Sequence, residues 1–327
     1  MGKAISNKAF LAGGLLALSA SALFTGKVIV AKLVYARGVD PVGLVFLRML
    51  FSLPFYAGIL LFQLHRGARI GCRDVWTVMF LGILGYYVSS MLDFTGIRYI
   101  STALERMILQ LAPSFVMLYG IVFCGDKFDR KLLVALVIGY VGVALMVGSE
   151  LGSAPTAAHA ANSWIGVLCV LGSTAIFAVS LIWGERLLRR VKSGVMTSIA
   201  MLAAGAAIFL HYAIAKGVVV PTHDPVALGW GAFLAIFCTV IPTYMNNEAV
   251  HLIGGARMGP FNYVGMGLTF VVSAFVLDER FPVFKLLGII LAVVGALALT
   301  LGRMGWSWSG RKPADKETAA AKRESAE

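Results

Sequence analysis

Ten apolar segments, each of roughly 20 residues and so long enough to cross a bilayer as a helix, fill most of this chain. Charged, Gly or Pro residues separate them. Apolar residues make up 59% of the sequence, and the mean hydropathy is +0.85. Because backbone polar groups in lipid must be satisfied internally, we expect an all-α integral membrane protein. The predicted transmembrane helices are Phe10–Ala31, Pro41–Gln63, Val75–Ile97, Ile100–Phe123, Leu132–Gly148, Trp164–Gly184, Val195–Ala215, Ala227–Asn247, Gly255–Val276 and Val283–Leu301.

The net charge of +12 follows from topology and does not indicate a nucleic-acid partner. With a cytoplasmic N-terminus, the inside segments hold far more Lys and Arg than the outside loops, which is the positive-inside pattern. We therefore expect both termini in the cytoplasm, a bacterial inner membrane as the location, and membrane lipids as neighbours.

The four cysteines show no spacing typical of a metal site or a disulfide framework. Sequence motifs of hydrolases, metalloproteases and phosphate-binding loops are also missing. We expect no metal, no cofactor and no enzymatic activity. An intramembrane enzyme is the weakest of the alternatives.

The sequence repeats itself with a constant step of 153 residues, for example from Leu18 to Leu171 and from Gly142 to Gly295. Each half carries five predicted helices. Since five is odd, the second half enters the membrane from the opposite side, which gives two inverted repeats around a central cavity. The expected domains are residues 1–9 (cytoplasmic), 10–149 (first repeat), 150–163 (flexible external linker), 164–302 (second repeat) and 303–327 (disordered cytoplasmic tail).

Small residues occupy matching positions in the fifth helix of each half. Ala135 and Gly139 are four residues apart, and so are Gly288 and Ala292. Such spacing lets helices approach closely. Packing within one chain and a homodimer contact are equal alternatives.

Five charged residues lie well inside predicted helices of the first half: Lys27, Arg48, Asp93, Glu105 and Arg106. A lone charge at a helix centre costs about 2.5–3.5 kcal/mol on insertion scales. Counting residues from the helix ends puts all five in the outer third of the membrane. We expect them to meet in a site for an anionic or zwitterionic substrate. A purely structural ion-pair network, with Arg48 on Asp93, and snorkelling of Lys27 to the interface are the alternatives.

Polar side chains at helical spacing extend this candidate site. The third helix of each half carries a polar stripe, and the fourth and ninth helices add further polar groups. The further candidate substrate contacts are Tyr86, Ser90, Gln110, Thr243, Asn246, Asn262 and Tyr263. Candidates for charge balance or coupling are Asp93, Glu105 and Glu248, and the candidate hinges are Pro113 and Pro242.

Short motifs and the repeat together resemble the EamA-type members of the drug/metabolite transporter superfamily. The motifs are Gly38-Val39-Asp40-Pro41, Phe46-Leu47-Arg48, Arg98-Tyr99-Ile100-Ser101-Thr102-Ala103, Gly125-Asp126 and Asp278-Glu279-Arg280-Phe281. The resemblance implies a central cavity with the fifth and tenth helices outside it, and export of small metabolites by alternating access. Asp126 replaces the family's usual Glu, Met266 stands where a proline is common, and Leu23-Phe24 stands where a Trp is frequent. Lys27 is unusual and favours an anionic or zwitterionic substrate.

We therefore expect a transporter that exports a small anionic or zwitterionic metabolite held near Lys27, Arg48 and Arg106. A lipid-headgroup flippase of the same fold is the main alternative.

Overall fold

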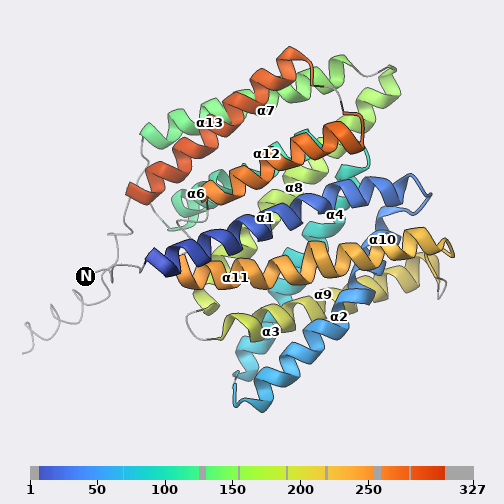
Figure 1. Ribbon diagram of the computed structural model, residues 1–327, viewed down its shortest axis with the longest axis vertical. Coiled ribbons are helices and arrows are strands. Elements are labelled where there is room, and N and C mark those ends of the chain that lie inside the picture. Colours follow the sequence, from blue (N-terminus) through green and yellow to red (C-terminus); the bar gives the residue numbers. More distant parts are fainter. Residues whose placement is uncertain are drawn as a thin grey trace, which may run out of the picture.

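The computed structural model describes residues 7–68, 70–124, 130–153, 155–188, 191–217, 220–253, 259–279 and 281–305, which form a bundle of helices (Figure 1). Every regular element in these ranges is helical. The elements are α1 (Asn7–Tyr35), α2 (Pro41–His65), α3 (Cys72–Gly82), η1 (Ile83–Val88), α4 (Ser89–Ile97), α5 (Thr102–Leu109), α6 (Ala112–Cys124), α7 (Arg130–Gly152), α8 (Ala157–Leu188), α9 (Ser193–Lys216), α10 (Pro225–Ala235), η2 (Ile236–Val240), α11 (Ile241–Ile253), α12 (Gly259–Val276) and α13 (Val283–Gly305).

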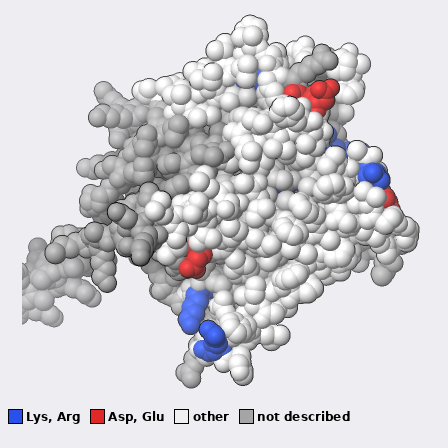
Figure 2. All heavy atoms as spheres, viewed as in Figure 1, with Lys and Arg blue, Asp and Glu red and all other residues white. Residues whose placement is uncertain are grey.

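Within the described ranges, six helical segments are long and apolar enough to cross a membrane: Leu11–Tyr35, Pro41–His65, Cys72–Ile97, Ala157–Gly184, Ser193–Lys216 and Pro225–Ala249. Shorter apolar helical stretches lie at Leu136–Gly152, Gly267–Val276 and Val283–Gly295. Large apolar side chains such as Ile214 (78% exposed) and Phe275 (86% exposed) face outward, and most of the face shown in Figure 2 carries neither Lys and Arg nor Asp and Glu. Water would not tolerate so much apolar surface, whereas lipid does. The prediction of an all-α integral membrane protein is confirmed for the described residues.

Two of the membrane-crossing segments contain a π-helical stretch. The first is η1, between α3 and α4, and the second is η2, between α10 and α11. In η2 the hydroxyl of Thr239 donates to the carbonyl of Leu234, five residues earlier, at 3.0 Å. π-helical stretches inside α-helices often mark functional positions, because they shift the register of every side chain beyond them. Pro242 is the second residue of α11, which begins directly after η2.

The predicted helix Ile100–Phe123 is broken in the structure. It consists of α5 and α6, with a turn at Gln110 and Leu111 between them. Pro113 is the second residue of α6, where the missing proline N–H costs no helical hydrogen bond. A proline in the first turn therefore starts a second short helix here and does not kink one long helix.

The segment expected to be a flexible linker is largely helical. Glu150 still belongs to α7, and α8 already begins at Ala157. Alanine has the highest helix propensity of all residues, so the alanine-rich stretch from Ala157 to Ala161 extends α8. Between α7 and α8, the only described residues outside the helices are Ser153, Pro155 and Thr156, which form turn and bend.

Helices from the two halves of the chain pack against each other in matching pairs. α1 lies beside α11 and α12, α8 lies beside α4 and α6, and α2 lies beside α9. α7 and α13 pack together along one edge of the bundle (Figure 1). There the Cα of Gly142 faces the backbone of Ala292, and a Cβ on Gly288 would come within 2.6 Å of Cγ of Met146. Gly288 and Ala292 thus serve packing within this chain. The side chain of Ala135 lies outside the described residues.

Candidate functional site

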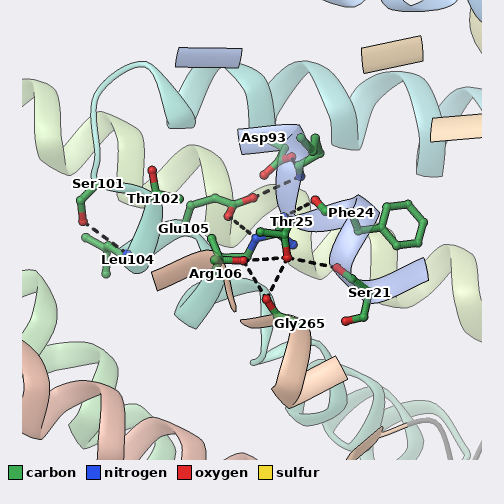
Figure 3. Close-up of polar contacts among 12 residues, drawn as sticks. Ser21, Phe24, Thr25, Asp93, Ser101, Thr102, Leu104, Glu105, Arg106 and Gly265 are labelled. Carbon is green, nitrogen blue, oxygen red and sulfur yellow. Dashed lines mark hydrogen bonds and ion pairs between the residues drawn. The ribbon is translucent and has the colours of Figure 1, made fainter. Parts of the chain in front are cut away.

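Four charged side chains meet between α1, α4 and α5, and we call them the charged cluster: Lys27, Asp93, Glu105 and Arg106. Figure 3 labels three of them, Asp93, Glu105 and Arg106. Nζ of Lys27 lies 2.6 Å from Oδ2 of Asp93 and 3.1 Å from Oε1 of Glu105. Nε of Arg106 lies 3.5 Å from Oε2 of Glu105. Residues that the sequence puts at one depth in the membrane thus contact one another, and Lys27 does not snorkel toward the interface.

The charged cluster is buried and balances its own charge. The side chain of Glu105 is fully buried, and that of Asp93 is 8% exposed. Lys27 and Arg106 are 15% and 16% exposed. Two cations and two carboxylates cancel, and such an arrangement is stable in a low-dielectric interior only because each charge has a partner. Lys27 and Arg106 therefore already have carboxylate partners within the charged cluster.

Hydrogen bonds to the α1 backbone and to α12 fix the charged cluster between the two halves of the chain. Arg106 donates to the carbonyl oxygen of Phe24. The hydroxyl of Thr25, the next residue, donates to the carbonyl oxygen of Gly265 at 2.8 Å (Figure 3). The hydroxyl of Thr269 donates to Thr25 at 3.1 Å. Gly265 and Thr269 belong to α12. Arg106 thus bonds to α1 at Phe24, and the next residue of α1, Thr25, bonds to α12.

Arg48 stands beside the charged cluster without joining it. Its side chain is only 6% exposed, and Nη2 donates to the hydroxyl of Ser90 at 3.0 Å. The guanidinium carbon lies 5.1 Å from the centre of the Phe94 ring, a cation–π contact. Nζ of Lys27 lies 5.6 Å from the same ring centre. Asp93 pairs with Lys27, and the Arg48–Asp93 ion pair of the structural alternative is absent from the described contacts.

The other predicted site residues occupy varied positions. Tyr86 lies in η1 and packs against a hydrophobic core that includes Phe94. Phe94 is the ring that Arg48 contacts. Thr243 of α11 donates to the carbonyl oxygen of Thr239, four residues earlier in η2, the common role of a hydroxyl in a membrane helix. Gln110 ends α5, and its N–H is 3.3 Å from the carbonyl oxygen of Arg106.

The structure describes the side chains of the predicted site residues on α11, but not those on α12. Asn246 is partly exposed on α11, and Glu248 is exposed on the same helix. Asn262 and Tyr263 belong to α12, but their side chains lie outside the described residues. The structure thus brings Lys27, Asp93, Glu105 and Arg106 into contact and puts Arg48 and Ser90 next to them. It does not bring Glu248 to them by any described contact.

A second ionic group, which the sequence did not reveal, holds the N-terminus of α5. We call it the cap group: Glu150, Glu279, Lys32 and Lys285. Oε1 of Glu150 accepts from the backbone N–H of Ser101 at 2.7 Å, and Oε1 of Glu279 accepts from that of Thr102 at 2.7 Å. The first N–H groups of a helix lack internal partners and attract negative charge.

Each glutamate of the cap group also pairs with a lysine from another helix. Lys32 of α1 lies 3.4 Å from Oε1 of Glu279, and Lys285 of α13 lies 3.6 Å from Oε2 of Glu150. Burial raises the pKa of Glu279, but Lys32, the Thr102 hydrogen bond and Lys285 together outweigh burial and hold that pKa below its ordinary value. Both ion pairs join the first half of the chain to the second. The hydroxyl of Ser101 adds a local cap, since its Oγ accepts from the backbone N–H of Leu104 at 3.3 Å. Nothing in the sequence pointed to the distant glutamates.

Two pockets lie on the surface of the described structure, and neither is lined by a residue of the charged cluster. One, of about 640 Å³, lies between α7 and the start of α13 and is lined by Val141, Leu145 and Phe284 among others. The second, of about 460 Å³, lies between α2 and α9 near Phe62 and Lys192. No group of three or more His, Cys, Asp or Glu side chains suited to a metal ion occurs in the described part of the chain.

Comparisons with known proteins agree with this architecture. The model of the EamA-like transporter family matches the chain twice, over residues 11–148 and 164–301. The uncharacterized transporter YcbK of Bacillus subtilis is 28% identical over 85% of this chain and 89% of its own length. The uncharacterized transporter YyaM of the same organism is 24% identical over 78% of this chain and 80% of its own.

A protein of known crystal structure shares the fold. It superposes with a TM-score of 0.62 and 18% sequence identity, covering 90% of this chain and 98% of its own. Apolar membrane-crossing helices, buried compensated charges and these matches agree with one another. The chain is an integral membrane protein and belongs to the EamA-like transporter family.

Proposed function

We propose that this protein is a secondary transporter that exports a small anionic or zwitterionic metabolite by alternating access. The observation that carries this proposal is the buried group of charges at the meeting of the two halves: the charged cluster, with Arg48 beside it. A membrane protein that needs only to be stable gains little from buried ions, because apolar residues of similar size serve at least as well. Ionisable residues at membrane depth mark transport pathways far more often.

Two inverted five-helix repeats would supply the moving parts. In support, equivalent elements begin at the same step along the chain: α3 and α10 at Cys72 and Pro225, and η1 and η2 at Ile83 and Ile236. The two family-model matches keep that step as well. The proposed arrangement has ten transmembrane helices, both termini in the cytoplasm and a bacterial inner membrane as its location.

The cap group would close the outer side of the pathway in this conformation. Its two ion pairs, Lys32 with Glu279 and Lys285 with Glu150, join the halves at one end of α5. Opening on that side would have to break both pairs. The turn before Pro113 and the π-helical stretch η2 before Pro242 are the proposed hinges, since the helical hydrogen-bond pattern changes at each.

Transport by purified protein in proteoliposomes tests the proposal. A panel of labelled anionic, zwitterionic, cationic and neutral metabolites would be assayed with and without a pH gradient, against protein-free vesicles. We expect uptake above background for anionic or zwitterionic compounds only. Background flux for every soluble compound would contradict the proposal, and movement of labelled phospholipid between leaflets would favour a flippase instead.

A further inference from the structure

The helices α2 and α9 lie side by side (Figure 1), and at one end of this pair a carboxylate joins them. Asp40 caps the N-terminus of α2, since its Oδ1 accepts from the backbone N–H of Gly43 at 3.2 Å. Nζ of Lys216, the last residue of α9, lies 3.1 Å from Oδ2 of the same carboxylate. An anion thus lies between the N-terminus of one helix and a cation from the end of its neighbour, where both attract it.

The opposite end of the same helix pair has a helix N-terminus and cations, but no carboxylate. Arg66 follows α2 directly, and α9 begins at Ser193, after its N-cap residue Lys192. Ser193 stands 153 residues after Asp40, which is the step that relates the two halves of the chain. The side chain of Lys192 makes no cap hydrogen bond. The position that Asp40 occupies at one end of the pair therefore carries a serine at the other.

A pocket of about 460 Å³ lies at this second end, between α2 and α9. Its volume is within the range of about 300–1,000 Å³ that is typical of ligand sites. A Cβ on Gly194 would overlap Nε2 of Gln63, so the first turn of α9 lies directly against α2. None of the described residues that line the pocket is Asp or Glu; they are Phe62, Gln63, Arg66, Lys192, Ser193 and Gly194.

Both cations of the pocket lack a counter-ion in the described part of the chain. Neither Arg66 nor Lys192 forms an ion pair there. The guanidinium carbon of Arg66 lies 4.5 Å from the centre of the Phe62 ring, a cation–π contact that leaves the guanidinium N–H groups available. Arginine binds phosphate through two parallel hydrogen bonds, lysine adds a point charge, and the first N–H groups of a helix favour the same anion. Phosphate is therefore the ligand chemistry that suits this pocket.

The surroundings of the pocket favour a lipid phosphate over a soluble one. α2 is one of the membrane-crossing segments, and beside the pocket the side chains of Leu61 and Phe62 are 67% and 55% exposed. A phospholipid can place its phosphate in the pocket and its acyl chains along these apolar side chains. Basic pockets between transmembrane helices bind anionic lipid headgroups on the cytoplasmic side, which is where the proposed topology puts this end.

We propose that Arg66, Lys192 and the first turn of α9 bind the phosphate of an anionic phospholipid headgroup. The lipid supplies at this end the negative charge that Asp40 supplies at the other, and it holds α9 to α2. The site is separate from the charged cluster and does not depend on which solute is transported. Its failure would therefore leave the proposed transport function standing.

Lipid binding to the purified protein in detergent tests the site. Thermal unfolding would be followed with added dioctanoyl phosphatidylglycerol, dioctanoyl phosphatidylcholine or inorganic phosphate, and native mass spectrometry would count the bound lipids. We expect phosphatidylglycerol to raise Tm and to remain bound as one molecule per chain. Phosphatidylcholine, which has no net charge, and inorganic phosphate should need at least tenfold higher concentrations for the same rise.

Three variants separate the pocket from general effects of charge. The double variant Arg66→Gln with Lys192→Gln should bind phosphatidylglycerol at least tenfold more weakly, and it should fold, because both side chains are exposed. Arg73→Gln, at an exposed arginine of α3 that does not line the pocket, is the matched control and should bind as the unaltered protein does. Ser193→Asp supplies the carboxylate from the chain itself. It should raise Tm without lipid and abolish the further rise with phosphatidylglycerol.

Several results would overturn the proposal. They are equal rises in Tm with phosphatidylglycerol and phosphatidylcholine, no rise with either, a double variant that responds like the unaltered protein, and a Ser193→Asp variant that still responds fully. An equal rise with inorganic phosphate at the same concentration would replace the lipid site with a site for soluble phosphate. A loss in Arg73→Gln as large as that in the double variant would show a general effect of surface charge and no specific site.

Discussion

Nζ of Lys27 lies 2.6 Å from Oδ2 of Asp93, and this contact joins α1 to α4 through the interior of the bundle. The same ammonium group reaches Oε1 of fully buried Glu105 at 3.1 Å. One cation therefore holds two carboxylates from two helical elements. Removal of that cation would leave both carboxylates in a low-dielectric environment with only Arg106 to compensate them.

Lys27→Ala should destabilise the protein and abolish transport. Breaking a buried ion pair by removing one partner costs about 3–5 kcal/mol, and partial exposure of Lys27 favours the lower end. Thermal unfolding in detergent measures the loss. The double variant Lys27→Met with Asp93→Asn removes both partners and should recover part of the lost stability. An unchanged Tm in Lys27→Ala would show that the contact is unimportant.

Glu279→Gln tests the cap group and its pH dependence. Because the pKa of Glu279 is held below its ordinary value, its contacts stabilise the folded protein at pH values above that ordinary value. They are lost only as the pH falls through the lowered pKa, below about 4.5. Between pH 5.5 and 8, the difference in Tm between the unaltered protein and Glu279→Gln should therefore stay constant.

The same variant also tests where proton coupling resides. Any pH dependence of transport between pH 5.5 and 8 should persist in Glu279→Gln, since Glu279 does not titrate there. Transport assays in proteoliposomes over this range provide the check. Loss of the pH dependence in the variant would contradict the assignment of Glu279 as a permanently ionised cap.

Gly142→Ala should disrupt the packing of α7 on α13, because a Cβ at this position overlaps the backbones of Gly288 and Ala292. Overpacking of this kind costs about 1–3 kcal/mol. Gly148→Ala on the same helix is the matched control, since a Cβ there meets nothing within 4 Å. Thermal unfolding should distinguish the two variants. Equal Tm values would argue against close contact between the helices.

The sequence predicts that the chain lies in a lipid membrane, that it is all-helical, and that Lys27, Asp93, Glu105 and Arg106 meet. Those predictions succeed because hydropathy and the cost of a buried charge are local quantities that can be read along a helix. Pairing is not local. The sequence could not show that Lys27 pairs with both carboxylates while Arg48 donates to Ser90. These contacts depend on the relative rotation of α1, α2 and α4.

The cap group escaped prediction for the same reason. Glu150 was assigned to a flexible linker and Glu279 to a short loop motif, yet both reach the first N–H groups of α5. Contacts between residues so far apart along the chain leave no periodic signal. The helical break before Pro113 was likewise invisible, since proline in the first turn of a new helix and proline that kinks a continuous one look alike in sequence.

Counterflow in proteoliposomes that contain the unaltered protein, Arg48→Gln or Arg98→Gln tests the central claim most directly. The labelled compound would be a solute transported by the unaltered protein. Arg48 is buried beside the charged cluster with Nε unpartnered, whereas Arg98 is exposed at the end of α4. We predict that Arg48→Gln lowers the exchange rate at least tenfold, while Arg98→Gln exchanges at the unaltered rate. Full exchange by a folded Arg48→Gln protein would contradict the account.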